Sequence, residues 1–220
     1  MPELPEVETI VRNLRRGTDG APSLIGQTIQ AAHLLWIRTL AEPDVETFQG
    51  MLPGQTVQTV GRRAKFLTLT LSESTMVIHL RMSGDLKMEP SETPIAKHDR
   101  MLLEFVSGWR LSFNDTRKFG RVWLVNDTQM LFSDLGPEPD DPALTPENFH
   151  EMLQTRKRTI KPLLLDQRFL AGMGNIYTDE ALFRARIHPL QSSELLDLQD
   201  AGRLLEAIRF TLARGIENNG

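Results

Sequence analysis

Apolar side chains near the start of the chain recur with the spacing of one helix face. They stand at i, i+3, i+4 and i+7, in Val7, Ile10, Val11 and Leu14. Leu4 and Pro5 open the pattern, and proline suits the first helical position because an N–H there has no partner within the helix. Glutamates in the first turn and arginines in the last complement the helix dipole, and Gly17 can end the helix. We therefore expect a helix that holds the N-terminus in place.

From residue 55 onward the period becomes that of strands. Alternating apolar and polar residues predict strands at 67–71, 76–80, 101–106, 109–113 and 121–125. The polar turns 72–75 and 107–108 join the first four of these into two hairpins. Upstream, an extended segment is expected over 27–40 and a short helix within 43–54. About the first 130 residues thus predict a β-rich domain fronted by one helix.

Beyond a segment rich in proline and aspartate, the periodicity turns helical. Thr145-Pro146-Glu147 is typical of a helix start. Further helices are expected at about 161–166 and 176–183 and in a last segment that reaches about residue 217. The whole pattern predicts an α+β fold with a β-rich domain over 1–133, a linker over 134–145 and a helical domain over 146–220.

Composition narrows the class of protein. With 220 residues, 40% of them hydrophobic, the chain can bury a core, and it has no apolar run long enough to cross a membrane. We expect a soluble, intracellular protein. The absence of cysteine excludes disulfides and thiolate metal sites. The formal net charge of -4 argues mildly against nucleic-acid binding. Acidic residues gather in 134–151 and basic ones in 156–168, however, which fits a basic surface as well as a solvated helix face.

The first residues place a potential nucleophile beside a potential acid. If Met1 is removed, Pro2 becomes a secondary amine that can condense with a sugar aldehyde, and α-amino groups have pKa values of about 7.7–8.0. Glu3 follows as a candidate general acid or base. The alternative is an ordinary solvated terminus. A chain that keeps Met1 would be an inactive precursor, because acylation turns the Pro2 nitrogen into an amide.

Two loops and one turn carry further candidate chemistry. The loops contain Met82, Arg117 and Phe119, which are either incidentally exposed hairpin residues or a wedge that fills the space left by an extruded base. The turn at 172–175 either binds a phosphate through its N–H groups or simply connects two helices. It is not a dinucleotide-binding motif, because no strand precedes it.

Several specific motifs are spread over essentially the whole chain. They are the opening Pro2-Glu3-Leu4-Pro5-Glu6-Val7-Glu8-Thr9, then Arg62-Arg63-Ala64-Lys65, His79-Leu80-Arg81-Met82-Ser83-Gly84, Lys97-His98-Asp99, Asp115-Thr116-Arg117-Lys118-Phe119-Gly120, Leu135-Gly136-Pro137-Glu138-Pro139 and Gly174-Asn175-Ile176-Tyr177. In combination they resemble the formamidopyrimidine-DNA glycosylase family, bacterial base-excision enzymes for oxidised purines. Leu4 favours this branch over the related endonuclease VIII branch, which usually opens Pro-Glu-Gly-Pro-Glu.

The resemblance implies a fold and a reaction. The fold would be a two-layered β-sandwich with an N-terminal helix, joined to a helical domain with a helix–two-turns–helix motif. The reaction would be that of a bifunctional DNA glycosylase and abasic-site lyase acting on 8-oxoguanine and formamidopyrimidines. Pro2 would attack C1′ of the damaged nucleoside, and the iminium would support β,δ-elimination. The alternatives are an endonuclease VIII-like specificity for oxidised pyrimidines and a catalytically silent lesion binder.

The resemblance also implies roles for individual residues. The catalytic residues would be Pro2, Glu3, Glu6 and Lys65. The DNA contacts would be Met82, His98, Arg117, Lys118, Phe119, Lys161, Asn175 and Tyr177. Of these, Met82, Arg117 and Phe119 would fill the void beside the flipped base, while Lys65, His98 and Asn175 would hold phosphates. Lys118 stands where the family more often has a second arginine, so a bidentate phosphate contact would become a point contact.

The expected partner is double-stranded DNA with oxidised or abasic sites, bound by a monomer in the bacterial cytoplasm at the nucleoid. Family members normally continue into a zinc finger with four cysteines, whereas this chain stops at Gly220 and has no cysteine. We therefore expect a fragment without metal or other cofactor, in which zinc belongs to the missing finger. Such a fragment should fold but bind damaged DNA weakly.

Overall fold

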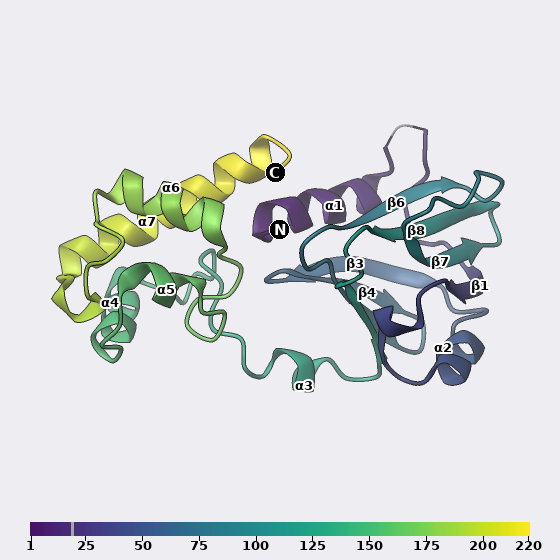
Figure 1. Ribbon diagram of the computed structural model, residues 1–220, viewed down its shortest axis with the longest axis horizontal. Helices are drawn as coiled ribbons and strands as arrows, with labels where there is room; N and C mark the ends of the chain where they lie inside the picture. The colour runs from purple at the N-terminus through teal and green to yellow at the C-terminus, as the bar shows by residue number, and fades with distance from the viewer. Residues whose placement is uncertain (19) are drawn as a thin grey trace. The chain divides into compact units, whose positions relative to one another are not determined.

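The computed structural model describes residues 1–18 and 20–220, which form two compact units. The first unit comprises Met1–Pro2 and Val7–Met130, and the second comprises Glu3–Glu6 and Leu131–Gly220. The first is rich in strands and the second is helical (Figure 1). In this division the first turn of the N-terminal helix counts with the helical unit, and so does the segment 134–145 that was expected as a linker.

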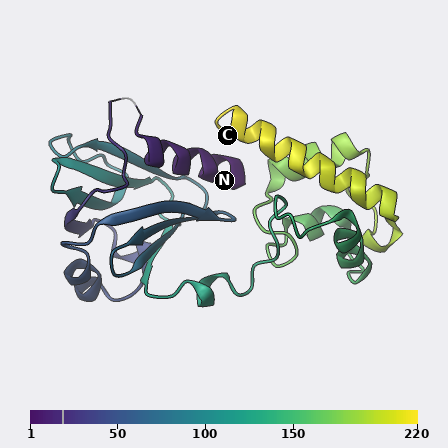
Figure 2. The ribbon, with the colours of Figure 1, turned by 180° about the vertical axis from the view of Figure 1, so that it is seen from behind.

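The strands of the first unit form two sheets (Figures 1 and 2). Their bounds are β1 Ile29–Leu34, β2 Leu40–Glu42, β3 Val57–Arg63, β4 Phe66–Leu71, β5 Thr75–His79, β6 Gly84–Pro90, β7 Asp99–Phe105, β8 Trp109–Asp115 and β9 Arg121–Val125. One sheet has the order β1-β7-β8-β6 and the other β2-β9-β5-β4-β3. Apolar side chains from both sheets share one buried core. The expected β-sandwich is confirmed.

Both expected hairpins are present, as the antiparallel pairs β4–β5 and β7–β8. Strand β6 was not expected, because its short alternation directly follows a loop. Leu86 and Met88 point into the core, while Asp85 and Lys87 are exposed along the edge of the sheet. The extended segment expected over 27–40 is shorter than predicted, since the chain leaves β1 at Leu34 and forms a 3-10 turn, η1, at Ile37–Thr39.

Helix α1 spans Leu4–Arg16, as its periodicity predicts. Val7, Val11 and Leu14 are buried in the sandwich core. Leu4, one turn earlier, is buried in the core of the helical unit, which is the physical reason that the first turn belongs to that unit. The other helix of the sandwich, α2 at Val45–Met51, begins where Asp44 accepts a hydrogen bond from the Thr47 N–H at 3.0 Å.

The helices that follow the strands are α3 Gln129–Phe132, α4 Pro146–Gln154, α5 Ile160–Leu165, α6 Asn175–Ala185, the 3-10 turn η2 Ser193–Leu195 and α7 Leu198–Glu217. Thr145 caps α4 and Asp197 caps α7 through their side chains. The apolar face expected for the last helix is buried. Helix α7 is amphipathic, and none of the helices in the described ranges is long and apolar enough to cross a membrane.

Candidate functional site

The carboxylate of Glu3 lies at the N-terminal end of α6. Its Oε1 accepts a hydrogen bond from the Ile176 N–H at 3.0 Å, and its Oε2 accepts a longer one from the Tyr177 N–H at 3.4 Å. The first N–H groups of a helix lack partners within it, and the helix dipole stabilises negative charge there. Glu3 is 2% exposed. The side chain that directly follows Pro2 is thus fixed, while Pro2 itself is half-buried before α1.

The glycine turn before α6 makes room for this carboxylate. A Cβ on Gly174 would lie 2.2 Å from Cδ of Glu3, and one on Gly172 would lie 2.6 Å from Cδ1 of Leu4. Sequence reasoning left open whether this turn binds a phosphate or connects helices. The anion at the mouth of α6 in the structure is the Glu3 carboxylate. Asn175 is exposed at the same helix start, and its phosphate contact stays a prediction.

Glu6 connects Tyr177 with the backbone beside Pro2. Its Oε1 accepts a hydrogen bond from the Tyr177 hydroxyl at 2.8 Å, and its Oε2 accepts one from the backbone N–H of Glu3 at 2.7 Å. Burial, together with this hydrogen bond, raises the pKa of Tyr177 far above its ordinary value, so the hydroxyl keeps its proton and donates. A Cβ on Gly215 would lie 2.5 Å from Cε1 of Tyr177. The ring therefore packs against bare backbone of α7.

Tyr177 is one of the expected DNA contacts, and that role stays a prediction. It is 7% exposed and belongs to the core of the helical unit. Lys161, another expected DNA contact, is half-buried, and its Nζ lies 2.7 Å from Oδ1 of Asp179 on α6. Ion pairs of this kind contribute only about 0–1 kcal/mol, so a phosphate could displace Asp179.

A buried aspartate joins the two loops that carry the expected wedge. Oδ1 of Asp115 accepts hydrogen bonds from the Ser83 hydroxyl at 2.5 Å and from the Arg117 N–H at 3.1 Å. Its Oδ2 accepts one from the Gly120 N–H at 2.7 Å. Asp115 is 1% exposed. The loop after β5 and the loop after β8 are therefore joined through Asp115, and the Ser83 hydroxyl also accepts the Arg117 N–H at 3.1 Å.

These two loops present Met82, Arg117 and Phe119. Met82 is 41% exposed and Phe119 52%. The Arg117 guanidinium carbon lies 5.2 Å from the centroid of the Phe119 ring, which is a cation–π contact. Large apolar side chains exposed together on fixed loops mark an interaction site more often than a bare surface. The structure thus places the expected wedge residues on joined loops, and their insertion into DNA stays a prediction.

Lys65 and His79 lie near each other at one end of the five-stranded sheet. Lys65 is 5% exposed in the turn between β3 and β4, and its neighbour Phe66 pairs with His79 across β4 and β5. The His79 ring meets Phe66 edge-on at 4.7 Å, and its Nδ1 accepts the Arg81 N–H at 3.0 Å. Burial, and then the charges of Arg81 and Lys65, lower the pKa of His79 to about 3. The imidazole is therefore neutral at pH 7, with its proton on Nε2.

His98 and Lys118 make separate contacts in the sandwich. Nδ1 of half-buried His98 lies 3.2 Å from Nη2 of Arg100. The backbone carbonyl of His98 accepts a hydrogen bond from the Asp115 N–H at 2.8 Å. Lys118 is exposed, and its Nζ lies 4.1 Å from the centroid of the Trp36 ring. The phosphate contacts expected of both residues stay predictions.

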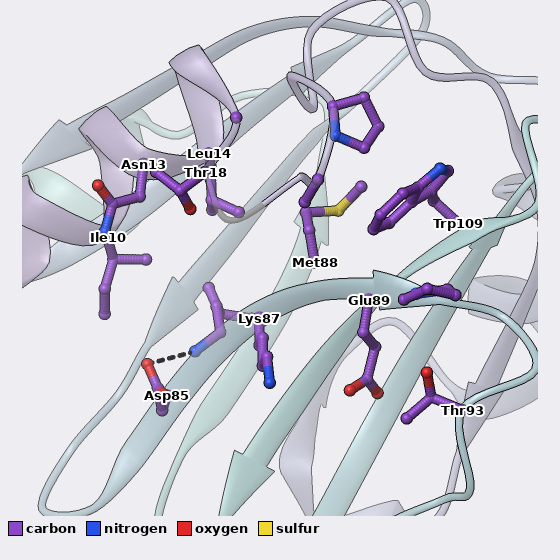
Figure 3. A pocket seen from close by; sticks show the side chains of 15 residues that line it. Ile10, Asn13, Leu14, Thr18, Asp85, Lys87, Met88, Glu89, Thr93 and Trp109 are labelled. Carbon is purple, nitrogen blue, oxygen red and sulfur yellow. Dashed lines mark hydrogen bonds between the residues drawn. The ribbon is translucent and has the colours of Figure 1, made fainter.

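Two surface hollows in the described part of the chain are lined by residues outside the expected site. One of about 530 Å³ lies between the C-terminal half of α1 and strand β6, beside Asn13, Lys87 and Trp109 (Figure 3). Another of about 540 Å³ lies beside Phe183 and Phe210 on α6 and α7. The sequence has no cysteine, so it contains none of the four cysteine ligands of the family's zinc finger. Within residues 1–18 and 20–220, no group of three or more histidine, aspartate or glutamate side chains could hold a metal ion.

Comparison with known protein families agrees with this geometry. Residues 1–122 match the formamidopyrimidine-DNA glycosylase N-terminal domain, and residues 135–220 match the formamidopyrimidine-DNA glycosylase H2TH domain. Together the two matches cover nearly all of the chain.

The chain belongs to the formamidopyrimidine-DNA glycosylase family.

Individual family members are similar over the full length of the chain. Formamidopyrimidine-DNA glycosylase of Protochlamydia amoebophila is 42% identical over 221 residues, which cover 100% of this chain and 78% of the relative. The Chloroflexus aurantiacus protein of the same name is 46% identical over 224 residues, with the same coverage. The solved structure of Lactococcus lactis formamidopyrimidine-DNA glycosylase, bound non-covalently to DNA containing an AP site, superimposes with a TM-score of 0.91 at 33% identity. It covers 100% of this chain and 83% of the solved chain.

Some residues of this family member become visible as functional candidates only in the structure. Asp115 and His79 stand within the motifs, and nothing in the sequence distinguishes His79 from an ordinary strand residue. Aspartate at a strand end, followed by a loop that ends in glycine, was the available signal for Asp115. Gly215 carried no signal, because a glycine inside a helix reads only as a weak helix former. Trp36 likewise had no local pattern.

Proposed function

We propose that the chain is a bifunctional DNA glycosylase and abasic-site lyase that excises oxidised purines in base excision repair. The observation that carries this proposal is the fixed Glu3 carboxylate directly beside Pro2, in a member of the formamidopyrimidine-DNA glycosylase family. A pure binding protein would need neither a buried carboxylate nor a secondary amine at its N-terminus. The substrates would be 8-oxoguanine and formamidopyrimidines in double-stranded DNA.

The proposed nucleophile is the amine of Pro2 after removal of Met1. Its lone pair attacks C1′, the bond from C1′ to the base breaks, and the base leaves with those electrons and takes up a proton. The Pro2 nitrogen then gives up its proton to the Glu3 carboxylate, opening of the C1′–O4′ bond gives an iminium, and Glu3 passes that proton on to O4′. Loss of a C2′ proton then expels the 3′ phosphate, and a second elimination expels the 5′ phosphate.

Other residues would position the reactants. Glu6 holds the backbone N–H of Glu3, so it fixes the peptide unit that joins Glu3 to the nucleophile. Met82, Arg117 and Phe119 would fill the space left by the extruded nucleotide, since their loops are already tied together. Solved complexes of Lactococcus lactis formamidopyrimidine-DNA glycosylase with DNA that contains an AP site or Fapy-dG support this choice of ligand.

Borohydride trapping on an abasic duplex and on an 8-oxoguanine duplex tests the proposal. We expect a covalent adduct on both, located at the N-terminal peptide by mass spectrometry. The adduct should be absent from protein that retains Met1, and it should form much more slowly in Pro2→Gly with Met1 removed, whose N-terminal glycine still offers a primary amine. Binding of the same duplexes by fluorescence anisotropy serves as control, because both altered proteins should still bind.

Each alternative gives a different result. An adduct located by mass spectrometry at a lysine such as Lys65, and not at the N-terminal peptide, would make that lysine the nucleophile. Binding without any adduct would make the protein a silent lesion binder. Faster cleavage of oxidised-pyrimidine duplexes than of oxidised-purine duplexes would assign it the endonuclease VIII-like specificity. Action as a monomer in the bacterial cytoplasm, and zinc in a finger outside these residues, are parts of the same proposal.

A further inference from the structure

The side-chain amide of Gln167 binds the backbone of the glycine turn before α6. Its Nε2 donates hydrogen bonds to the carbonyls of Leu165 at 3.0 Å and Met173 at 2.9 Å, and its Oε1 accepts one from the Gly172 N–H at 3.0 Å. Both N–H donors of the amide group are therefore used, and so is its oxygen. Half-buried Gln167 thus joins the end of α5 to the turn over 172–174.

The turn that Gln167 holds lies directly against the proposed catalytic carboxylate. A Cβ on Gly174 would lie 2.5 Å from Oε1 of Glu3, so the carboxylate packs against bare backbone of this turn. The carbonyl of Gly172 accepts a hydrogen bond from the N–H of Leu4, the residue after Glu3, at 3.3 Å. Any displacement of the turn must therefore displace Glu3 or the first N–H groups of α6.

The motif at 135–137, to which the proposed function gives no role, holds the loop that carries Gln167. The Gly136 N–H donates a hydrogen bond to the carbonyl of Gln167 at 2.9 Å, and the carbonyl of Pro137 accepts one from the Ala171 N–H at 2.9 Å. A Cβ on Gly136 would lie 2.6 Å from a carbonyl oxygen of the same loop, so the two segments pack backbone against backbone. The Gln167 side chain therefore extends from a fixed backbone.

We propose that Gln167 is a positioning residue for Glu3 and that it acts through the glycine turn. By holding Gly172 and Met173, it keeps the first N–H groups of α6 directed at the Glu3 carboxylate. Gln167 touches neither the sugar nor the base in this role. The inference rests on the proposed function, in which Glu3 takes a proton from the Pro2 nitrogen and passes it to O4′.

The proton transfers assigned to Glu3 depend closely on its position. A group that transfers a proton must come within about 2.6–3.2 Å of the atoms that give and receive it. Without the Gln167 amide, the Gly172 N–H and the Met173 carbonyl lose their partner and the turn can shift. A misplacement of about 1 Å can cost a factor of about 100 in rate, so a smaller shift should slow the chemical step while DNA still binds.

Single-turnover borohydride trapping on an abasic duplex, together with binding of that duplex by fluorescence anisotropy, tests the inference. The variants are Gln167→Ala and Gln167→Met. The methionine keeps the length of the side chain without its polar atoms, so it stays interpretable if Gln167→Ala does not fold. Gln154→Ala is the matched control, because Gln154 is a glutamine of the same unit whose Nε2 donates to the carbonyl of Leu196 at 2.9 Å.

We expect both Gln167 variants to slow trapping by saturating protein about tenfold, with a Kd for the duplex within about twofold of wild type. Gln154→Ala should trap at the wild-type rate. In a Glu3→Gln background, Gln167→Ala should cause no further slowing, because the group that it positions is already gone. A merely structural role would slow trapping by the same factor in both backgrounds.

Nitrogen–proton correlation NMR spectra of the free protein give a readout that needs no catalysis. The Ile176 N–H donates to Glu3, so its chemical shift reports on that hydrogen bond. Both Gln167 variants should move the Ile176 signal in the direction in which Glu3→Gln moves it, and Gln154→Ala should leave it in place.

Three results would each overturn the inference. They are an Ile176 signal at the wild-type position in a folded Gln167 variant, equal slowing by Gln167→Ala in both backgrounds, and weaker DNA binding at an unchanged trapping rate. Failure of the proposed function is distinguishable, because wild-type protein would then form no adduct. The Ile176 signal would still decide whether Gln167 positions Glu3.

Discussion

Gly215 leaves space for the Tyr177 ring, which is hydrogen-bonded to the residues of the proposed site. A Cβ at this position would lie 2.5 Å from Cε1 and 2.6 Å from the hydroxyl of Tyr177. That hydroxyl donates to Glu6, which in turn accepts the backbone N–H of Glu3. Two hydrogen bonds therefore connect the Tyr177 ring, for which Gly215 leaves space, with the peptide unit that joins Glu3 to the proposed nucleophile Pro2.

We predict that Gly215→Ala slows borohydride trapping about tenfold, because the ring must shift and the bond to Glu6 is lost. Tyr177→Phe should slow it about as much, and the double variant should be no slower than Gly215→Ala alone. Single-turnover trapping on an abasic duplex measures all three. Gly202→Ala is the control within the same helix, since its nearest neighbour would be 3.7 Å away. It should trap at the wild-type rate, and additive effects of Gly215→Ala and Tyr177→Phe would contradict the prediction.

His79 makes the stability of the sandwich depend on pH. Its pKa is lowered to about 3 in the folded protein, from a model-compound value of 6.5. Between these values the unfolded chain binds more protons, so stability rises with pH and is lost as the pH falls from 6.5 toward 3. The loss can reach about 1.4 kcal/mol per pH unit.

We expect the free energy of unfolding to fall less between pH 7 and pH 5 in His79→Asn than in wild type. Urea titrations followed by tryptophan fluorescence report on this unit, because Trp36, Trp109 and Trp123 all lie in it. His188→Gln, at an exposed position, should leave the pH dependence unchanged. Equal pH dependence in His79→Asn and wild type would assign the loss to other groups.

At the scale of elements, the two wedge loops act as one part because Asp115 holds both. Both carboxylate oxygens accept hydrogen bonds, Oδ1 from Ser83 and Arg117 and Oδ2 from Gly120. An asparagine at this position would replace one of the two accepting oxygens with an NH2 group. That NH2 group would face an N–H or O–H donor and could not accept its hydrogen bond. A buried donor left without a partner costs about 1–3 kcal/mol.

Asp115→Asn should therefore destabilise the sandwich by about 1–3 kcal/mol and reduce the preference for lesion over undamaged duplex, because the loops lose their common anchor. Urea unfolding and competition binding measure the two effects. Asp85→Asn changes the same group at an exposed position of β6 and should alter neither. If the discrimination survives while stability falls, the loops do not need Asp115 to present Met82 and Phe119.

At the scale of the whole molecule, α1 contributes to both units. Leu4 is buried in the helical core, whereas Val7, Val11 and Leu14 are buried in the sandwich core. The proposed catalytic residues sit at the point in the chain where this assignment changes, since Pro2 belongs to the first unit and Glu3 to the second.

We predict that Leu4→Ala increases amide hydrogen exchange in α6 and α7 and leaves the sandwich strands protected. Leu14→Ala should do the reverse. Each removes a buried leucine, which costs about 2–5 kcal/mol of local stability. Mass-spectrometric hydrogen exchange resolves the two regions. Equal changes in both regions for both variants would show that the molecule unfolds as one cooperative body.

The sequence by itself determined the family and many of the elements, although not strand β6. Local patterns of residues predict the period of α1, the two hairpins and the start of α4, and the specific motifs are local as well. Each depends on residues close together in the chain, so the sequence alone reveals it. Glu3 and Pro2 were identified as candidate chemistry for the same reason, because they are neighbours in the chain.

Only the tertiary structure decided what these residues touch. Glu3 contacts the start of a helix 173 positions away, and Asp115 contacts Ser83 at a separation of 32. Tyr177 became a buried donor to Glu6, and Trp36 became the partner of Lys118. Such contacts arise when strands and helices pack against one another. Packing brings together residues that are far apart in the chain, and the sequence around one of them does not predict the other.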